Sequence, residues 1–294
     1  LSAGAVPVLA SIGDGGAGDA AITTTIASVL PGSARLVKDL GATLVLPATN
    51  SYTGGTALNG GTIRVASDGN LGAAAGGLSF NGGTLHTTAS FASSRTINLA
   101  GSGTFRIDAG TTLAASGAIS GAGALIKDGA GRLLLTAASS HTGGTTIAAG
   151  SLELGAGGSI TGNVTNNGLL LVSRTDALTL AGMISGSGTF QQAGSGTTTL
   201  TGANSYTGAT EILAGTLLIN GNQSAATALT TVASGATLGA AGTIGGRVTV
   251  ANGGTLAPGN SPGTLTINGN LALSSGSQLA FELGAANAVG SPLN

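Results

Sequence analysis

Apolar residues alternate with other residues in three short segments of the chain. In each segment two aliphatic side chains flank one middle position. The aliphatic residues are Ile63 and Val65, Leu152 and Leu154, and Leu217 and Ile219, and the middle residues are Arg64, Glu153 and Leu218. Successive side chains of a strand point to opposite faces. The pattern therefore predicts three strands whose aliphatic residues face a core and whose middle residues face solvent.

These strands belong to three copies of one longer segment. The copies align on a threonine that is Thr53 in the first copy, Thr142 in the second and Thr207 in the third. Other shared positions are Gly54, Gly143 and Gly208; Thr56, Thr145 and Thr210; and Gly61, Gly150 and Gly215. The two spacings between copies are close to multiples of about 22 residues, which is in the range of solenoid repeats. We therefore expect the copies to recur after whole numbers of such coils.

The rest of the chain is predicted to form short strands. Segments rich in threonine, valine, isoleucine and leucine are bounded by the turn residues glycine, asparagine and serine. The best helical candidate, residues 20–30, contains a threonine triplet that favours a strand. One coil cannot bury its own apolar face, whereas stacked coils enclose a continuous core. We predict an all-β fold: a right-handed parallel β-helix, or solenoid, of roughly 13 coils in a single elongated domain.

The repeated segment resembles a known family. "GANSYTGATEILAGTLLING" and its two sister copies are similar to the passenger-associated transport repeat of bacterial autotransporters, and residues 253–284 resemble another segment of such passengers. The resemblance covers most of the chain from about residue 34. We thus expect weakly matched N-terminal coils over residues 1–33 and a β-helical repeat region over residues 34–294, truncated at its C-terminal end. The repeat is unspecific for activity, because it resembles one shared by adhesins, esterases and proteases.

The composition narrows the classes of function. Charged residues make up 6% of the chain, aromatic residues 2% and apolar residues 41%, and the formal net charge is −1. A near-neutral chain with scattered lysines and arginines argues against binding of nucleic acid or anionic membranes. Cysteine is absent, so there is no disulfide or thiolate metal site. The sequence contains no apolar run of transmembrane length and no signal peptide. If the protein is exported, we expect its export signals to lie outside this piece.

Two glycine-rich motifs match the consensus sequences of functional sites but lack the other features that those sites require. Residues 259–263 fit the G-x-S-x-G pattern of serine hydrolases, but Pro262 follows Ser261 and lacks the N–H that an oxyanion hole needs. Residues 13–18 fit the dinucleotide pattern G-x-G-x-x-G, but no helix is expected after them. A calcium-binding repeat fails at Ala20, where an aspartate is required. We interpret these motifs as turns.

The two histidines, His86 and His141, suggest no metal site, because neither has a second histidine nearby in the sequence. His141 occupies the repeat position of Tyr52 and Tyr206 and is expected to be a structural corner residue. The acidic residues are dispersed, whereas polysaccharide-cleaving enzymes need paired carboxylates. We assign no catalytic, cofactor-binding, metal-binding or ligand-binding residue.

One small polar patch is predicted. Arg106 and Asp108 share a strand face and are expected to form, with Arg64, a solvated surface group. Two sequons, at Asn163 and Asn222, carry little meaning in the bacterial context that the resemblance implies. The patch is therefore the one place where charged side chains are expected to gather.

The resemblance implies a passenger of the AIDA-like adhesin type. Such a passenger lies on the surface of a gram-negative cell or is released from it, and it crosses the outer membrane through its own C-terminal β-barrel. We predict a non-catalytic role in adhesion, self-association or biofilm formation, with other copies of itself or host-surface or matrix molecules as partners, no nucleic acid and no cofactor. The alternative is a structural stalk that displays an N-terminal esterase or protease; a catalytic β-helix such as a polysaccharide lyase is a third reading.

Overall fold

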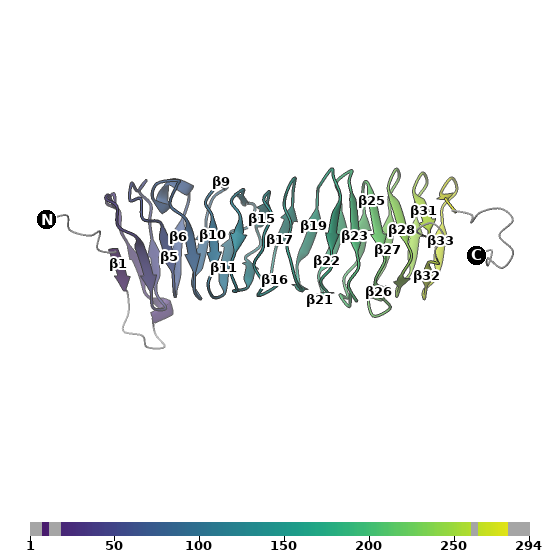
Figure 1. The fold of residues 1–294 in the computed structure, drawn as a ribbon, viewed down its shortest axis with the longest axis horizontal. Coiled ribbons are helices and arrows are strands. Elements are labelled where there is room, and N and C mark those ends of the chain that lie inside the picture. Colours follow the sequence, from purple (N-terminus) through teal and green to yellow (C-terminus); the bar gives the residue numbers. More distant parts are fainter. Residues whose placement is uncertain (1–7, 12–18, 260–263, 282–294) are drawn as a thin grey trace. The chain divides into compact units, whose positions relative to one another are not determined.

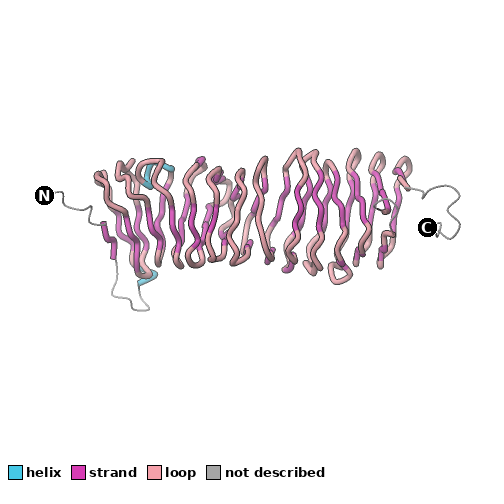
Figure 2. The backbone as a smooth tube through the Cα atoms, in the orientation of Figure 1, coloured by secondary structure: helices cyan, strands magenta, loops and turns pink. Residues whose placement is uncertain are grey.

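The computed structural model describes residues 8–11, 19–259 and 264–281, and its strands pair in parallel throughout (Figure 1). Strands and turns alternate regularly along the described chain (Figure 2). The described residues include no α-helix, only the 3-10 turns η1 (Asp19–Ala21) and η2 (Asp68–Leu71). The predicted parallel β-solenoid is confirmed, with about 13 turns in all. Residues 20–30 contain a strand, β2 (Thr23–Thr25), as expected.

Contacts divide the chain into two compact units. Unit 1 comprises Leu1–Leu152 and Gly157–Thr161, and unit 2 comprises Glu153–Ala156 and Gly162–Asn294. The division expected at residues 33 and 34 stays a prediction.

Unit 1 has three parallel sheets. Its first sheet contains, in spatial order, β1 (Val8–Ser11), β3 (Leu36–Asp39), β5 (Thr56–Leu58), β7 (Leu78–Phe80), β10 (Ile97–Leu99) and β13 (Ile119–Ser120). The second contains β2, β4 (Thr43–Val45), β6 (Thr62–Val65), β8 (Thr84–Thr87), β11 (Gly103–Ile107), β14 (Leu125–Asp128) and β16 (Thr145–Ile147). The third contains β9 (Phe91–Ser93), β12 (Thr112–Ala115), β15 (Arg132–Leu135) and the first two residues of β17 (Ser151–Leu154).

Unit 2 is built in the same way. One sheet contains β19 (Leu169–Val172), β22 (Thr189–Gln192), β24 (Thr210–Ile212), β27 (Thr230–Val232), β30 (Val248–Val250) and β33 (Leu271–Leu273). A second contains β20 (Leu178–Leu180), β23 (Thr197–Leu200), β25 (Thr216–Ile219), β28 (Thr237–Ala240), β31 (Thr255–Pro258) and β34 (Gln278–Leu279). The other strands are the pair β18 (Val164–Asn166) and β21 (Ile184–Ser185), and the set β26 (Asn222–Gln223), β29 (Thr243–Ile244) and β32 (Thr266–Ile267).

The predicted coil length is close to the observed one. Val248 pairs with Thr230 of the preceding coil and with Leu271 of the following coil. Its separation in sequence from Thr230 is shorter than its separation from Leu271. Most parallel partners are separated by a length between these two, near the predicted value of about 22 residues. The coil length varies because the turns differ in length, whereas the register within each strand pair is regular.

The expectation that the copies recur after whole numbers of coils is wrong. Four coils after Leu36, the residue on the same sheet is Ile119, and Leu125, which aligns with Leu36, lies on the next strand. The first copy therefore supplies β3 and β5 to the first sheet and β4 and β6 to the second, whereas the second copy supplies β14 and β16 to the second and β15 and β17 to the third. The repeat encodes two stacked strand pairs and is indifferent to the sheet on which they lie.

The core follows the predicted alternation. All six aliphatic positions of the three aligned strands are at most 2% exposed, and Arg64 is exposed. The aromatic rings of Phe80 and Phe105 add one tilted contact, with centroids 4.9 Å apart. The solvent-facing prediction is wrong for Glu153, which is buried because Ser173 of the following coil covers it and donates a hydrogen bond of 2.5 Å to Glu153 Oε1.

The shared glycine of the repeat has a steric cause. Gly61, Gly150 and Gly215 have φ values of 58°, 65° and 63°, a left-handed conformation that disfavours side chains. A Cβ at Gly150 would also overlap the carbonyl oxygens of Gly129 and Gly131 in the preceding coil. The position therefore requires glycine for two independent reasons.

Substitution of this glycine should separate the cost of the left-handed backbone from the cost of the overlap with the preceding coil. We expect Gly150→Ala to lower the free energy of unfolding by about 3 kcal/mol or more, because the methyl group collides with fixed backbone. Gly110→Ala is the matched control: Gly110 has a φ of 74° but open space around it, so about 1–2 kcal/mol is expected. Chemical denaturation measures both, and equal losses in the two variants would contradict the steric account.

Candidate functional site

The glycine-rich motifs of the sequence contribute no described site. Residues 13–18 and 260–263 lie outside the described residues, so neither motif is placed. Within the described ranges, no three histidine, cysteine, aspartate or glutamate residues lie together in a way that could hold a metal ion. The part of the chain that the structure describes also contains no helix with the length and apolarity of a membrane span.

His141 has the structural place that its repeat position predicts. The Tyr52 hydroxyl lies 2.7 Å from Thr56 Oγ1, and the Tyr206 hydroxyl lies 2.6 Å from Thr210 Oγ1. In the second copy the same contact joins His141 Nε2 to Thr145 Oγ1 at 3.1 Å. All three rings are buried. The shared threonine of the repeat is thus the hydrogen-bond partner of a buried ring.

Burial changes the titration of these rings in opposite directions. It raises the pKa of Tyr206 to about 12 and lowers the pKa of His141 below its usual value, because each charged form would lose its hydration. The backbone of Gly144 opposes the shift of the His141 pKa in part. The Ser139 hydroxyl of the second copy and the Asn204 Nδ2 of the third are buried and have no hydrogen-bond partner among the described residues.

Lysines at a second repeat position are buried and hold turns together. Lys127 Nζ donates to the carbonyl oxygens of Asp128, Gly129 and Ala149 at 2.9, 2.7 and 3.0 Å. Lys38 makes the equivalent contacts in the first copy, and the third copy uses Gln192, whose Nε2 lies 2.8 Å from the Gly194 carbonyl oxygen. Burial lowers the pKa of Lys127 to about 8. These side chains serve the fold and are withdrawn from the surface.

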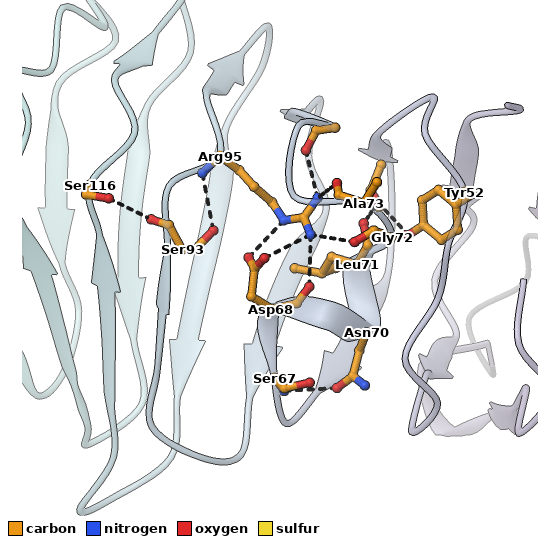
Figure 3. Close-up of polar contacts among 12 residues, drawn as sticks. Tyr52, Ser67, Asp68, Asn70, Leu71, Gly72, Ala73, Ser93, Arg95 and Ser116 are labelled. Atoms are coloured by element: carbon orange, nitrogen blue, oxygen red, sulfur yellow. Dashed lines mark hydrogen bonds and ion pairs between the residues drawn. The ribbon is translucent and has the colours of Figure 1, made fainter. Parts of the chain in front are cut away.

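Arg95 is a buried cation that the sequence did not point to. Its Nε and Nη2 bind the two carboxylate oxygens of Asp68 at 2.8 and 2.9 Å, and its other hydrogen bonds reach carbonyl oxygens of Asp68, Gly72, Ala73 and Gly76 (Figure 3). The network fixes the segment that contains η2 against the following coil. A bidentate pair with this many satisfied donors is a structural clamp, since no part of the guanidinium group is left for a ligand.

The predicted polar patch exists with different pairing. Arg64, His86 and Arg106 are register partners on β6, β8 and β11, so they form one row on the outward face of the second sheet. Asp108 pairs with His86, with Oδ1 and Nε2 2.8 Å apart, and not with Arg106 as sequence proximity suggests. Arg64 and Arg106 have no partner among the described residues. The sequence feature that indicates this row is the spacing of about one coil between Arg64, His86 and Arg106.

An open groove of about 460 Å³ lies on the outward face of the first sheet of unit 1. Polar side chains of β7, β10 and β13 line it, together with Arg35, which precedes β3. The Arg35 guanidinium reaches over β5 and donates from Nη2 to the Ser79 hydroxyl. No acidic residue lines the groove among the described residues. Neither the groove nor Arg35 was singled out from the sequence.

Comparison with known proteins identifies the repeat. Residues 36–65, 125–154 and 190–219 match the model of the passenger-associated-transport repeat. This chain carries three passenger-associated-transport repeats. They coincide with the three copies described above, so the predicted resemblance to an autotransporter passenger is confirmed.

A curated relative supports the same assignment. The adhesin BmaC autotransporter of Brucella suis biovar 1 (strain 1330) is 50% identical to this chain over 181 residues, which is 60% of this chain and 5% of that protein. The chain thus spans a small part of the length of the relative that it matches. No solved structure matches the chain. The printed name of this relative describes an adhesin and an autotransporter, in agreement with the match to the passenger-associated-transport repeat.

The buried histidine predicts a pH-dependent stability. A depressed pKa in the folded state gives a contribution that is complete above about pH 6.5, the ordinary histidine pKa, and is lost as the pH falls toward the folded value. His141→Tyr restores the residue of the other copies and removes the titration. We expect its melting temperature to exceed that of the parent chain by more at pH 5 than at pH 7.5. A difference between the two proteins that does not depend on pH would contradict the assignment of the buried neutral ring.

Proposed function

We propose that this chain is a non-catalytic segment of an adhesin-type passenger, which mediates adhesion and self-association through the outward faces of its coils. The observation that carries the proposal is the use of charged and ring side chains inside the fold, which leaves rows of threonines on the outward faces. The carbonyl-binding Lys127, the buried His141 and the clamped Arg95 are committed to the fold.

The outward faces are suited to repeated weak contacts. Threonines recur in register on the second sheet of unit 1 and on the β23 sheet of unit 2, and the two rows are Thr23, Thr43, Thr62, Thr84 and Thr104, and Thr197, Thr216, Thr237 and Thr255. Strand neighbours are about 4.8 Å apart, so each row presents hydroxyl and methyl groups at a constant interval. A second copy of the chain offers the same interval, and many weak contacts add up on a surface with many copies.

A stalk that displays an esterase or protease is the alternative. It is favoured by the same observation that charged groups are used inside the fold, and by the small share of the relative that this chain covers. Under the stalk hypothesis, the outward rows of threonines bind no other molecule. The two readings differ in what happens to cells when the rows are altered.

Cell aggregation tests the proposal. In a strain that displays the full-length protein, we expect deletion of residues 34–294 to abolish clumping. The triple variant Thr62→Lys, Thr84→Lys and Thr104→Lys should reduce clumping several-fold, because like charges along a row repel. The control variant Thr53→Lys, Thr165→Lys and Thr201→Lys adds the same charge at exposed threonines outside the rows and should leave clumping unchanged.

Surface display is measured in parallel with an antibody to the remaining passenger, so that a loss of export is recognised. A triple variant that is not exported is replaced by a variant with one of its three substitutions. Clumping that persists in the deletion strain at equal display would refute self-association and favour the stalk. Equal loss in both triple variants would refute the role of the rows.

A further inference from the structure

The groove on the first sheet of unit 1 has the features of a binding site. Two of its lining residues are glycines at close contacts between coils: a Cβ at Gly54 would lie 2.5 Å from the backbone nitrogen of Arg35, and a Cβ at Gly77 would lie 2.9 Å from Thr96 Oγ1. The depression is thus built into the packing of successive coils.

The groove presents polar groups at the interval of the strands. Ser79, Asn98 and Ser120 are register partners on β7, β10 and β13, so a hydroxyl, an amide and a second hydroxyl follow one another along it. Asn98 and Ser120 are exposed. Strand neighbours are about 4.8 Å apart, which is close to the length of one pyranose unit in an extended oligosaccharide. A linear sugar chain could therefore place one ring beside each strand.

The charge of the groove indicates which kind of sugar would bind there. Arg35 is the one charged residue among those that line the groove. One Nη2 contact to Ser79 leaves the other N–H groups of its guanidinium without a partner among the described residues. Guanidinium binds carboxylates in a bidentate manner and carries its charge at every physiological pH. The groove thus combines one carboxylate-binding end with a run of hydroxyl-binding groups.

We propose that this groove binds a linear acidic oligosaccharide, with Arg35 on a carboxylate and Ser79, Asn98 and Ser120 on ring hydroxyls. This inference goes beyond self-association and does not depend on it. The groove lacks an aromatic platform for stacking among its described lining residues, so a single site should be weak, with a Kd of about 0.1–1 mM. Many copies on one surface would raise the apparent affinity.

Titration of the purified chain with tetragalacturonate tests the proposal. Chemical-shift perturbation or calorimetry should show saturable binding, and the methyl-esterified tetramer should bind at least tenfold more weakly because it offers no carboxylate. Arg35→Gln should weaken tetragalacturonate binding at least tenfold. Arg247→Gln, which removes an exposed arginine of unit 2, should leave it unchanged.

A groove-filling variant, Asn98→Trp, provides an independent readout, since it should block binding without removing charge. Thermal melting confirms that each variant is folded. Absence of binding by the parent chain at about 10 mM, equal weakening by Arg247→Gln, or equal binding of the esterified tetramer would each overturn the proposal. Aggregation of cells is measured separately, so failure of one proposal leaves the other standing.

Discussion

The close stacking of coils is the constraint on which the rest of the structure depends. Successive strands are separated by about 4.8 Å, and at each inward turn the carbonyl oxygens of the previous coil occupy the space that a side chain would need. Gly150 satisfies this constraint by having no Cβ and a left-handed backbone. Lys127 satisfies it by donating hydrogen bonds to the carbonyl oxygens of the turn. The repeated residues are therefore the residues that allow one coil to lie on another.

This constraint explains why so little of the chemistry is available at the surface. Buried polar groups are mostly paired, and buried charged side chains such as Lys127 are used for that purpose. The contacts of Arg95 with Asp68 and four carbonyl groups are the clearest case. What remains outside includes the rows of threonines and the groove on the first sheet of unit 1. Recognition by such a molecule is expected to depend on positions that the repeat leaves free.

The sequence was sufficient for the fold class because its strongest signal, the alternation at Ile63, Arg64 and Val65, is local. It also placed His141 correctly, since alignment with Tyr52 and Tyr206 shows a ring position. It failed where position depends on a neighbour one coil away. The burial of Glu153 depends on Ser173, and the pairing of His86 with Asp108 depends on the register between adjacent coils. Whole-number recurrence failed because a stacked pair of strands can lie on any sheet.

The central claim is that each repeat is a self-contained set of two stacked strand pairs whose place in the fold is set by coil stacking alone. Replacement of residues 36–65 by the sequence of residues 125–154 tests it most directly, because the two segments are equal in length and occupy different pairs of sheets, the first and second against the second and third. Hydrogen exchange followed by mass spectrometry would measure protection of the transplanted strands. We predict protection close to that of the parent chain. Loss of protection across the transplanted strands would contradict the claim.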